Sequence, residues 1–340
     1  MNKKIVSVLL IVTLLLTLGG CGKNEQGEVG GTPSEKTIKI KIANWYAIDH
    51  PQNIALEKFK ELVETNSDKQ IEVQIYPNSQ LGSEDTFIDS VKKGSVEMGV
   101  PGIMISKDAP SIAVAEIPFL FDSWEHARKV LQGSLGDEIV KDLIPKAGVR
   151  NLAWTVNGFR EISSNREISK FEDFEGLRLR VPNVPYYVEM AKALNTNPIA
   201  MPFSELFTAL EQKVVDGQDN PYSTVKASKI YEVQSHMLET RHIFSPNLWV
   251  INEEFYQSLS EENQNIIIDA AKEAADLNWE LSIRKDLEDK ESLEEAGIKI
   301  ITPDEAFKKK LIESQAPVYQ WFYDKYPGME DLAERIRNEK

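Results

Sequence analysis

Apolar and polar residues alternate in several short stretches of the N-terminal part of the chain, with helically spaced runs between them. Residues 37–43, 70–76 and 96–100 have the period-two pattern of strands. Between them, an apolar stripe follows Pro51, which can begin a helix, and a second helical run follows Ser83, a suitable N-cap. Strands that alternate with helices predict an α/β fold with a mainly parallel sheet.

The same alternation continues to the C-terminus. Further strands are predicted at 149–156, 177–181, 198–201, 247–251 and 298–301, and helices at 124–131, 137–147, 186–194 and 204–215, the last with Ser204 as its cap. Ser260 precedes a helical pattern over residues 261–296, which would be roughly 54 Å long. A helix of this length can cross two domains. Helical, amphipathic sequence follows from Pro303 onward.

The first residues have the layout of a targeting segment. Lys3 and Lys4 precede an apolar run that ends in Leu-Gly-Gly-Cys, with Cys21 as the only cysteine of the chain. The ending resembles a bacterial lipobox, so we expect a signal peptide over 1–21 and a lipid on Cys21, with an ordinary signal peptide as the alternative. Residues 22–36 are polar and predict a flexible tether. The mature protein is therefore expected to be exported and held at the cell membrane.

Composition narrows the possible partners. With 41% hydrophobic and 27% charged residues the chain is typical of a globular protein. The net charge is −15 and becomes −17 once Lys3 and Lys4 are removed with the signal peptide. Such an acidic protein is not expected to bind nucleic acid, because phosphate recognition needs basic patches. The single cysteine excludes a disulfide framework within the chain.

Two arginines are the strongest candidates for ligand contacts. Arg180 is expected at the carboxyl end of strand 177–181, the edge at which open α/β sheets present groups to ligands. Arg160 follows Phe159, at a point where the preceding strand is expected to end. A guanidinium can donate two parallel hydrogen bonds to a carboxylate, so the pair predicts capture of a small anion.

The alternative for these arginines is structural. Both could form surface ion pairs with acids such as Glu161 or Glu175.

Several longer motifs are similar to one protein family. The run NPIAMPFSELFTALEQKVVDGQDNP (197–221), with FEGLRLRVP, NGFREISSN and YPNSQLGSE before it, resembles the substrate-binding subunits of TRAP transporters, the DctP family. The resemblance implies a two-domain periplasmic-binding-protein-like α/β fold in which a long helix spans both domains. It places domain I at 37–157 plus 246–285 and domain II at 158–245 plus 286–340. It also implies ligand contacts from Arg180, Arg160 and Asn220.

Other residues are weaker candidates for the cleft. Asn44, Trp45 and His50 follow the first strand, where the first domain should face the cleft, but His50 could equally cap or pack the next helix. Phe203 and Trp249 could form an apolar wall or belong to the core. In sialic-acid-binding relatives a glutamate follows the third strand. Here Gly102 and its neighbours occupy that place, which argues against an acid there and against an amine-bearing ligand.

The favoured function is a solute-binding protein that delivers a small organic acid, such as a uronate, an aldonate or a C4-dicarboxylate, to a membrane permease. We expect a monomer without cofactor, and no metal site, since His126, His236 and His242 lack ligands at metal spacing. One alternative is the same fold presenting its ligand to a sensor. The other is an exported acidic-sugar enzyme that uses Asp216 and Asp219 as acid and base.

Overall fold

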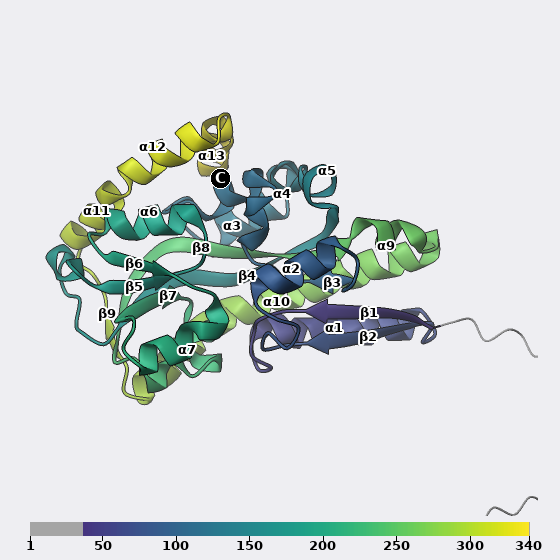
Figure 1. The fold of residues 1–340 in the computed structure, drawn as a ribbon, viewed down its shortest axis with the longest axis horizontal. Coiled ribbons are helices and arrows are strands. Elements are labelled where there is room, and N and C mark those ends of the chain that lie inside the picture. The colour runs from purple at the N-terminus through teal and green to yellow at the C-terminus, as the bar shows by residue number, and fades with distance from the viewer. Residues whose placement is uncertain (1–36, 340) are drawn as a thin grey trace, which may run out of the picture. The chain divides into compact units, whose positions relative to one another are not determined.

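A computed structural model describes residues 37–339 of the chain (Figure 1). The predicted signal peptide, the predicted lipidation site Cys21 and the predicted tether lie outside the described residues. Within that range, no helix is long and apolar enough to cross a membrane. The described residues pack as one contiguous unit, so the domain boundaries expected from the family resemblance remain predictions.

A nine-stranded mixed sheet runs through the described part of the chain. Its strands are β1 (Ile38–Ala43), β2 (Ile71–Tyr76), β3 (Met98–Gly99), β4 (Val149–Ser164), β5 (Arg178–Val181), β6 (Asn197–Ala200), β7 (Gly217–Asn220), β8 (His236–Asn252) and β9 (Lys299–Ile301). The order is β2-β1-β3-β8-β4-β7-β5-β6, and β9 pairs with β8. We call the part with β1 to β3 the first half and the part with β5, β6, β7 and β9 the second half.

The prediction of a mainly parallel sheet is correct only within the two halves. β1 pairs in parallel with β2 and β3, and β5 pairs in parallel with β6 and β7. The long central strands β4 and β8 are antiparallel to each other, and so are the pairs β3–β8 and β4–β7. The two halves are therefore joined by an antiparallel centre.

The first half contains the predicted strand–helix units. Its helices are α1 (Pro51–Asn66), α2 (Glu84–Lys92), α3 (Trp124–Leu131), α4 (Ser134–Val140) and α5 (Leu143–Ala147), with short 3₁₀ helices η1 (Met104–Lys107) and η2 (Pro110–Glu116). His50 caps α1 by accepting a hydrogen bond from the amide of Gln52. Ser83 stands at the N-cap of α2, but its hydroxyl contacts Thr86 Oγ1 instead of the helix backbone. The single helix expected over 137–147 is two helices.

The central strands are much longer than predicted, and this corrects the placement of Arg160. β4 does not end at Phe159 but continues to Ser164, so Arg160 lies inside the strand, opposite Ile243 of β8. Register shifts on both sides of this point bend the strand without ending it. Gly158 adopts φ +124° there, and a Cβ on it would lie 3.1 Å from the Trp124 ring. Its role is a bulge rather than a turn.

The second half has the remaining short helices. These are η3 (Phe171–Phe174), α6 (Pro185–Ala193), α7 (Phe203–Glu211), α8 (Tyr222–Ala227) and η4 (Ile230–Glu232). The helix predicted over 204–215 begins and ends earlier than expected: α7 has Pro202 at its N-cap, so Ser204 is inside it. A separate small apolar cluster, which includes Leu206, Val225 and Leu293, underlies α7 and α8. Most other buried apolar residues form one core.

The predicted long helix is present as α10 (Glu261–Glu295), about 53 Å long, after the short α9 (Glu253–Ser258). The Ser260 hydroxyl caps it by accepting from the amide of Asn263. α10 packs on α1 in the first half, on β4, and on α8 in the second half, which confirms that it spans both. Buried side chains fix its middle to β4: Asn278 Oδ1 accepts from the Val156 amide at 2.7 Å.

The C-terminal helices connect the two halves again. They are α11 (Glu305–Ser314), α12 (Ala316–Lys325) and α13 (Met329–Asn338). α12 packs on α6 of the second half and α13 on η2 of the first, so the segment passes from one half to the other (Figure 1).

Candidate functional site

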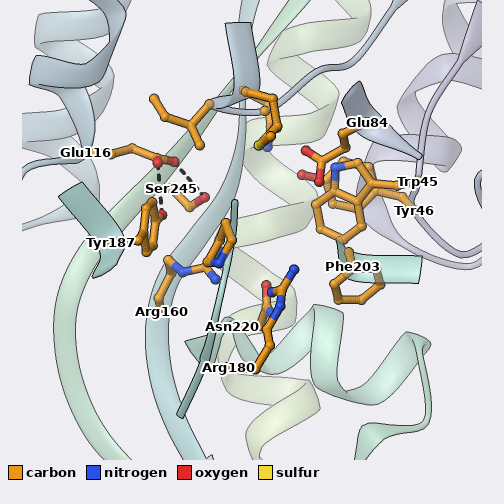
Figure 2. A pocket seen from close by; sticks show the side chains of 15 residues that line it. Trp45, Tyr46, Glu84, Glu116, Arg160, Arg180, Tyr187, Phe203, Asn220 and Ser245 are labelled. Carbon is orange, nitrogen blue, oxygen red and sulfur yellow. Dashed lines mark hydrogen bonds between the residues drawn. The ribbon is translucent and has the colours of Figure 1, made fainter. Parts of the chain in front are cut away.

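A pocket lies between the two halves, and both contribute side chains to it (Figure 2). From the first half and its connections come Trp45, Tyr46, Glu84, Gly102, Ile103, Met104 and Glu116. From the second half and the central strands come Arg160, Arg180, Pro182, Tyr187, Phe203, Asn220, Ser245 and Asn247. Five predicted residues, Trp45, Arg160, Arg180, Phe203 and Asn220, are thus brought together in one place.

Arg180 is the most unusual group in this pocket. The residue is 2% exposed, and its Nε and one terminal nitrogen donate to the Met201 carbonyl at 3.1 and 2.8 Å. Among the described residues it forms no ion pair with a carboxylate. Burial, followed by the neighbouring charge of Arg160, lowers the pKa of Arg180 to about 10. A buried cation without a partner acid is costly unless an anion approaches it.

Arg160, in contrast, already has its anion. Its Nε donates to Asp219 Oδ2 at 2.6 Å, and a terminal nitrogen donates to the Asp219 carbonyl. His242 Nε2 lies 3.3 Å from the same carboxylate oxygen. Burial alone would raise the pKa of Asp219, but Arg160 and His242 outweigh it and lower that pKa. The partner of Arg160 is therefore a buried aspartate, and neither Glu161 nor Glu175.

Glu116 forms a hydrogen-bonded cluster on the other side of the pocket. Its Oε2 accepts from the hydroxyl of Tyr187 at 2.9 Å, and its Oε1 accepts from Ser245 at 3.0 Å (Figure 2). The hydroxyl of Tyr186 also donates to Oε2, at 2.8 Å. Burial raises the pKa of this carboxyl group. Because Glu116 belongs to η2 and the tyrosines to α6, the cluster also connects the two halves across the pocket.

Aromatic rings form one wall. Trp45 stacks on Tyr46 with ring centroids 3.8 Å apart and contacts Phe203 at 4.4 Å. The Arg180 guanidinium lies 5.9 Å from the Phe203 ring. Trp45 Nε1 is buried and has no hydrogen-bond partner among residues 37–339. The wall therefore offers apolar surface to a carbon skeleton together with an indole donor.

Asn220 is held in place by a short relay of amides. It lies at the end of β7, opposite Glu161 of β4, and its Nδ2 donates to Gln218 Oε1 at 2.6 Å. Gln218 in turn donates to Ser163 Oγ at 2.8 Å. This relay orients the Asn220 amide beside Arg180 (Figure 2).

The position of Glu84 contradicts the expectation that no acidic side chain lies near Gly102. The sequence near Gly102 suggested that no acid lies there, but Glu84 Oε1 would be 3.1 Å from a Cβ placed on Gly102. The acid comes from the start of α2, far away in the chain. Burial, opposed by the charge of Arg180, raises the pKa of Glu84 to about 8.

The other three predicted residues do not line the pocket. Asn44 is buried, donates to Asn53 Oδ1 at 2.9 Å, and accepts at its Oδ1 from the amide of Tyr46 at 2.9 Å. His50 caps α1 and contacts Asn157 Oδ1 at 3.1 Å, in accordance with the capping alternative. Trp249 donates to Gln52 Oε1 at 3.0 Å and packs edge-on against a core phenylalanine, as a core residue would.

Sequence reasoning missed Glu84, Glu116, Tyr187 and Ser245. Glu84 is the last residue of the YPNSQLGSE motif, so that motif could have indicated it. Glu116, Tyr187 and Ser245 are isolated polar residues in apolar or mixed segments. Their chemistry emerges only where three separate segments meet.

The aspartates proposed as an enzymatic acid and base are both held in ion pairs. Asp219 pairs with Arg160, and Asp216 Oδ2 accepts from Arg178 Nε at 3.0 Å. In the described part of the chain, no group of three or more His, Cys, Asp or Glu side chains is arranged to hold a metal ion.

A family model described as "Bacterial extracellular solute-binding protein, family 7", the DctP family, matches residues 42–326. The chain belongs to this family. Its members are solute-binding proteins, and the mixed sheet with a long spanning helix agrees with their two-domain fold.

Several relatives are similar over most of their length. A TRAP periplasmic solute-binding protein from Haemophilus influenzae RdAW, solved with bound L-gulonate, is 41% identical with a TM-score of 0.86, covering 89% of this chain and 100% of that chain. The sugar acid binding protein DctPAm from Advenella mimigardefordensis strain DPN7T, in complex with galactonate, is 32% identical with a TM-score of 0.86, covering 89% and 98%. The 2,3-diketo-L-gulonate-binding periplasmic protein YiaO of Escherichia coli K12 is 33% identical over 74% of this chain and 77% of that protein.

Proposed function

We propose that this family 7 protein captures a sugar acid, an aldonate or a uronate, outside the cytoplasm and delivers it to the membrane permease of a TRAP transporter. The observation that carries the proposal is Arg180, a buried guanidinium without an acid partner in the described chain, which lines a pocket between the two halves. A ligand carboxylate supplies the missing negative charge through charge-assisted hydrogen bonds.

The rest of the pocket suits a polyhydroxylated carbon chain. The Asn220 amide and Trp45 Nε1 offer polar contacts, and the rings of Trp45 and Phe203 offer apolar surface. Sugar acids present both kinds of surface. Structures of relatives contain gulonate, galactonate and galacturonate, which supports the same ligand class for this chain.

The proposal includes a monomer anchored by lipid on Cys21. It rests on the lipobox-like ending of the first apolar run. Metabolic labelling with an alkyne palmitate analogue should mark the wild-type protein and not Cys21→Ala; labelling of both variants would rule out this anchor.

A thermal-shift screen tests the ligand class. L-Gulonate, D-galactonate and D-galacturonate should each be compared with neutral sugars and with cationic amino acids. At a concentration of about 100 times Kd, a true ligand adds roughly 2.7 kcal/mol to the free energy of unfolding, which raises Tm measurably. If only neutral sugars or cations raise Tm, carboxylate capture is the wrong function for this pocket.

A further inference from the structure

We propose that Glu84 restricts this pocket to sugar acids with one carboxylate, so that aldonates bind and the corresponding aldarates are rejected. The inference rests on the proposed function and adds a specificity-determining residue to it. An aldarate differs from its aldonate only at the far end of the carbon chain, where a second carboxylate replaces the terminal CH₂OH group.

The positive charge in the pocket is sufficient for one carboxylate. The lining contains two cations, Arg160 and Arg180, and no lysine or histidine. Arg160 is neutralised by Asp219 at 2.6 Å, behind the pocket surface. Arg180 alone remains for the ligand, and one carboxylate balances it. A second carboxylate in the same enclosed space has no counter-charge, which is costly in a desolvated site.

Two acids face Arg180 across the pocket (Figure 2). Both oxygens of Glu116 already accept hydrogen bonds, from Tyr186, Tyr187 and Ser245. The Glu84 side chain makes no hydrogen bond or ion pair with any residue that the structure describes, and its carboxyl group lines the pocket next to Gly102. Its oxygens are free to accept hydrogen bonds from ligand hydroxyls.

The ionised form of Glu84 favours a hydroxyl over a carboxylate. Burial raises the pKa of Glu84 to about 8, so both states occur near neutral pH. The ionised form accepts from a hydroxyl and repels a carboxylate. The protonated form can donate a hydrogen bond to a carboxylate as well as to a hydroxyl, so the discrimination comes from the ionised form and grows as pH rises through the pKa of Glu84. Like charges placed next to each other in an interface weaken binding.

Isothermal titration with two matched ligand pairs tests the inference. L-Gulonate is paired with D-glucarate, and D-galactonate with galactarate; each pair shares one carbon skeleton. Titrations at pH 8.5 keep most Glu84 ionised while Arg180, with a pKa of about 10, keeps its charge. The wild type should bind the aldonate that it recognises about 100-fold more tightly than the matching aldarate.

Glu84→Gln should reduce the ratio of the aldarate Kd to the aldonate Kd about tenfold or more, chiefly by strengthening aldarate binding. The amide keeps the size and hydrogen-bonding capacity of the side chain but removes its charge. Asp85→Asn is the matched control. Asp85 is the next residue of α2, pairs with Lys107 at 2.6 Å and does not line the pocket. This control should leave the preference within about threefold of wild type.

The outcomes separate this inference from the proposed function. If the wild type binds no aldonate or uronate, the proposed function fails and the inference with it. If it binds aldonates and aldarates equally well, the proposed function stands and the inference is wrong. A wild-type preference that is unchanged in Glu84→Gln, with folding confirmed by circular dichroism, would show that Glu84 is not the determinant.

Discussion

Arg178 and Arg180 are two positions apart on β5, yet their surroundings are opposite. Arg178 is exposed and forms an ion pair with Asp216 through its Nε, 3.0 Å from Oδ2. Arg180 is buried, lines the pocket and lacks an acid partner among the described residues. A surface ion pair contributes little to the free energy of unfolding, whereas a buried cation that pairs with a ligand anion contributes a large share of the affinity for the ligand.

Arg180→Ala should therefore weaken sugar-acid binding by about 2–5 kcal/mol, or roughly 30- to several-thousand-fold in Kd, because the ligand charge loses its partner in the pocket. Arg180→Lys should also bind less tightly than wild type, since an ammonium lacks the planar fork. Arg178→Ala is the control and should stay within about threefold. Isothermal titration with a sugar acid measures the Kd of each variant. A larger loss of affinity in Arg178→Ala than in Arg180→Ala would contradict the assignment of Arg180 as the carboxylate contact.

The roles of single residues could be predicted where the neighbouring sequence indicates their position in the fold. Arg180 stands at a strand end and Asn220 at the end of a polar run after a turn, and both line the pocket. Trp249 and Asn44 could not be distinguished from pocket residues, because an aromatic side chain within a strand, or an amide side chain after one, has the same local pattern in a core as in a pocket. Glu116 gave no signal, since its partners lie on distant segments.

At the scale of elements, the sequence predicted regular helices and short strands well and the long strands poorly. α3 was predicted with its observed bounds, and α10 to within one residue, because their apolar spacing is continuous and Ser260 marks the start of α10. β4 and β8 were predicted in part only. Gly158 and the register shifts interrupt the alternating pattern of β4, and Arg241 (φ +44°) and Pro246 interrupt that of β8. In a sequence, a β-bulge interrupts the alternation of apolar and polar residues in the same way as the end of a strand does.

The junction around His50 joins three elements. Its Nδ1 accepts from the amide of Gln52 in α1, so the neutral ring carries its proton on Nε2, which faces Asn157 of β4 at 3.1 Å and Thr224 of α8 at 3.3 Å. Burial lowers the pKa of His50 to about 3. In the unfolded chain a histidine binds a proton near pH 6.5.

This difference makes stability depend on pH. Between pH 6.5 and 3 the unfolded state binds a proton that the native state does not, so the free energy of unfolding falls as pH decreases, by up to about 1.4 kcal/mol per unit. Above pH 6.5 the contribution is constant. His50→Asn keeps an acceptor at the N-cap and removes the titrating group. Between pH 7 and pH 5 the wild type should lose about 2 kcal/mol more than His50→Asn in urea unfolding; equal losses would exclude His50 as the cause.

For the molecule as a whole, the pocket depends on both halves of the sheet. Arg160, Arg180 and Asn220 come from one side and Trp45, Tyr46 and Glu84 from the other. A ligand that contacts both halves binds more tightly to the conformation in which the halves are close. Binding therefore stabilises that closed conformation by the difference between its affinities for the closed and the open conformation. The hydrogen bonds of Glu116 to Tyr186 and Tyr187 belong to the same arrangement.

Binding should therefore make the protein more compact. Small-angle X-ray scattering should show a smaller radius of gyration with a saturating sugar acid than without it. A non-binding sugar serves as the control for solvent contrast. An unchanged radius of gyration with a ligand proven by titration would mean that the two halves do not move on binding.

The continuity of α10 determines what kind of movement this can be. The helix packs on α1 in one half and on α8 in the other, and its middle is fixed to β4 through Asn278 and Trp279. Relative rotation of the halves must therefore curve the helix, as long helices do gently over many residues. The deformation is spread over many backbone hydrogen bonds and produces a restoring force. The molecule should therefore bend elastically along α10 instead of rotating about a flexible hinge. A bound solute would keep the helix bent until the solute is released.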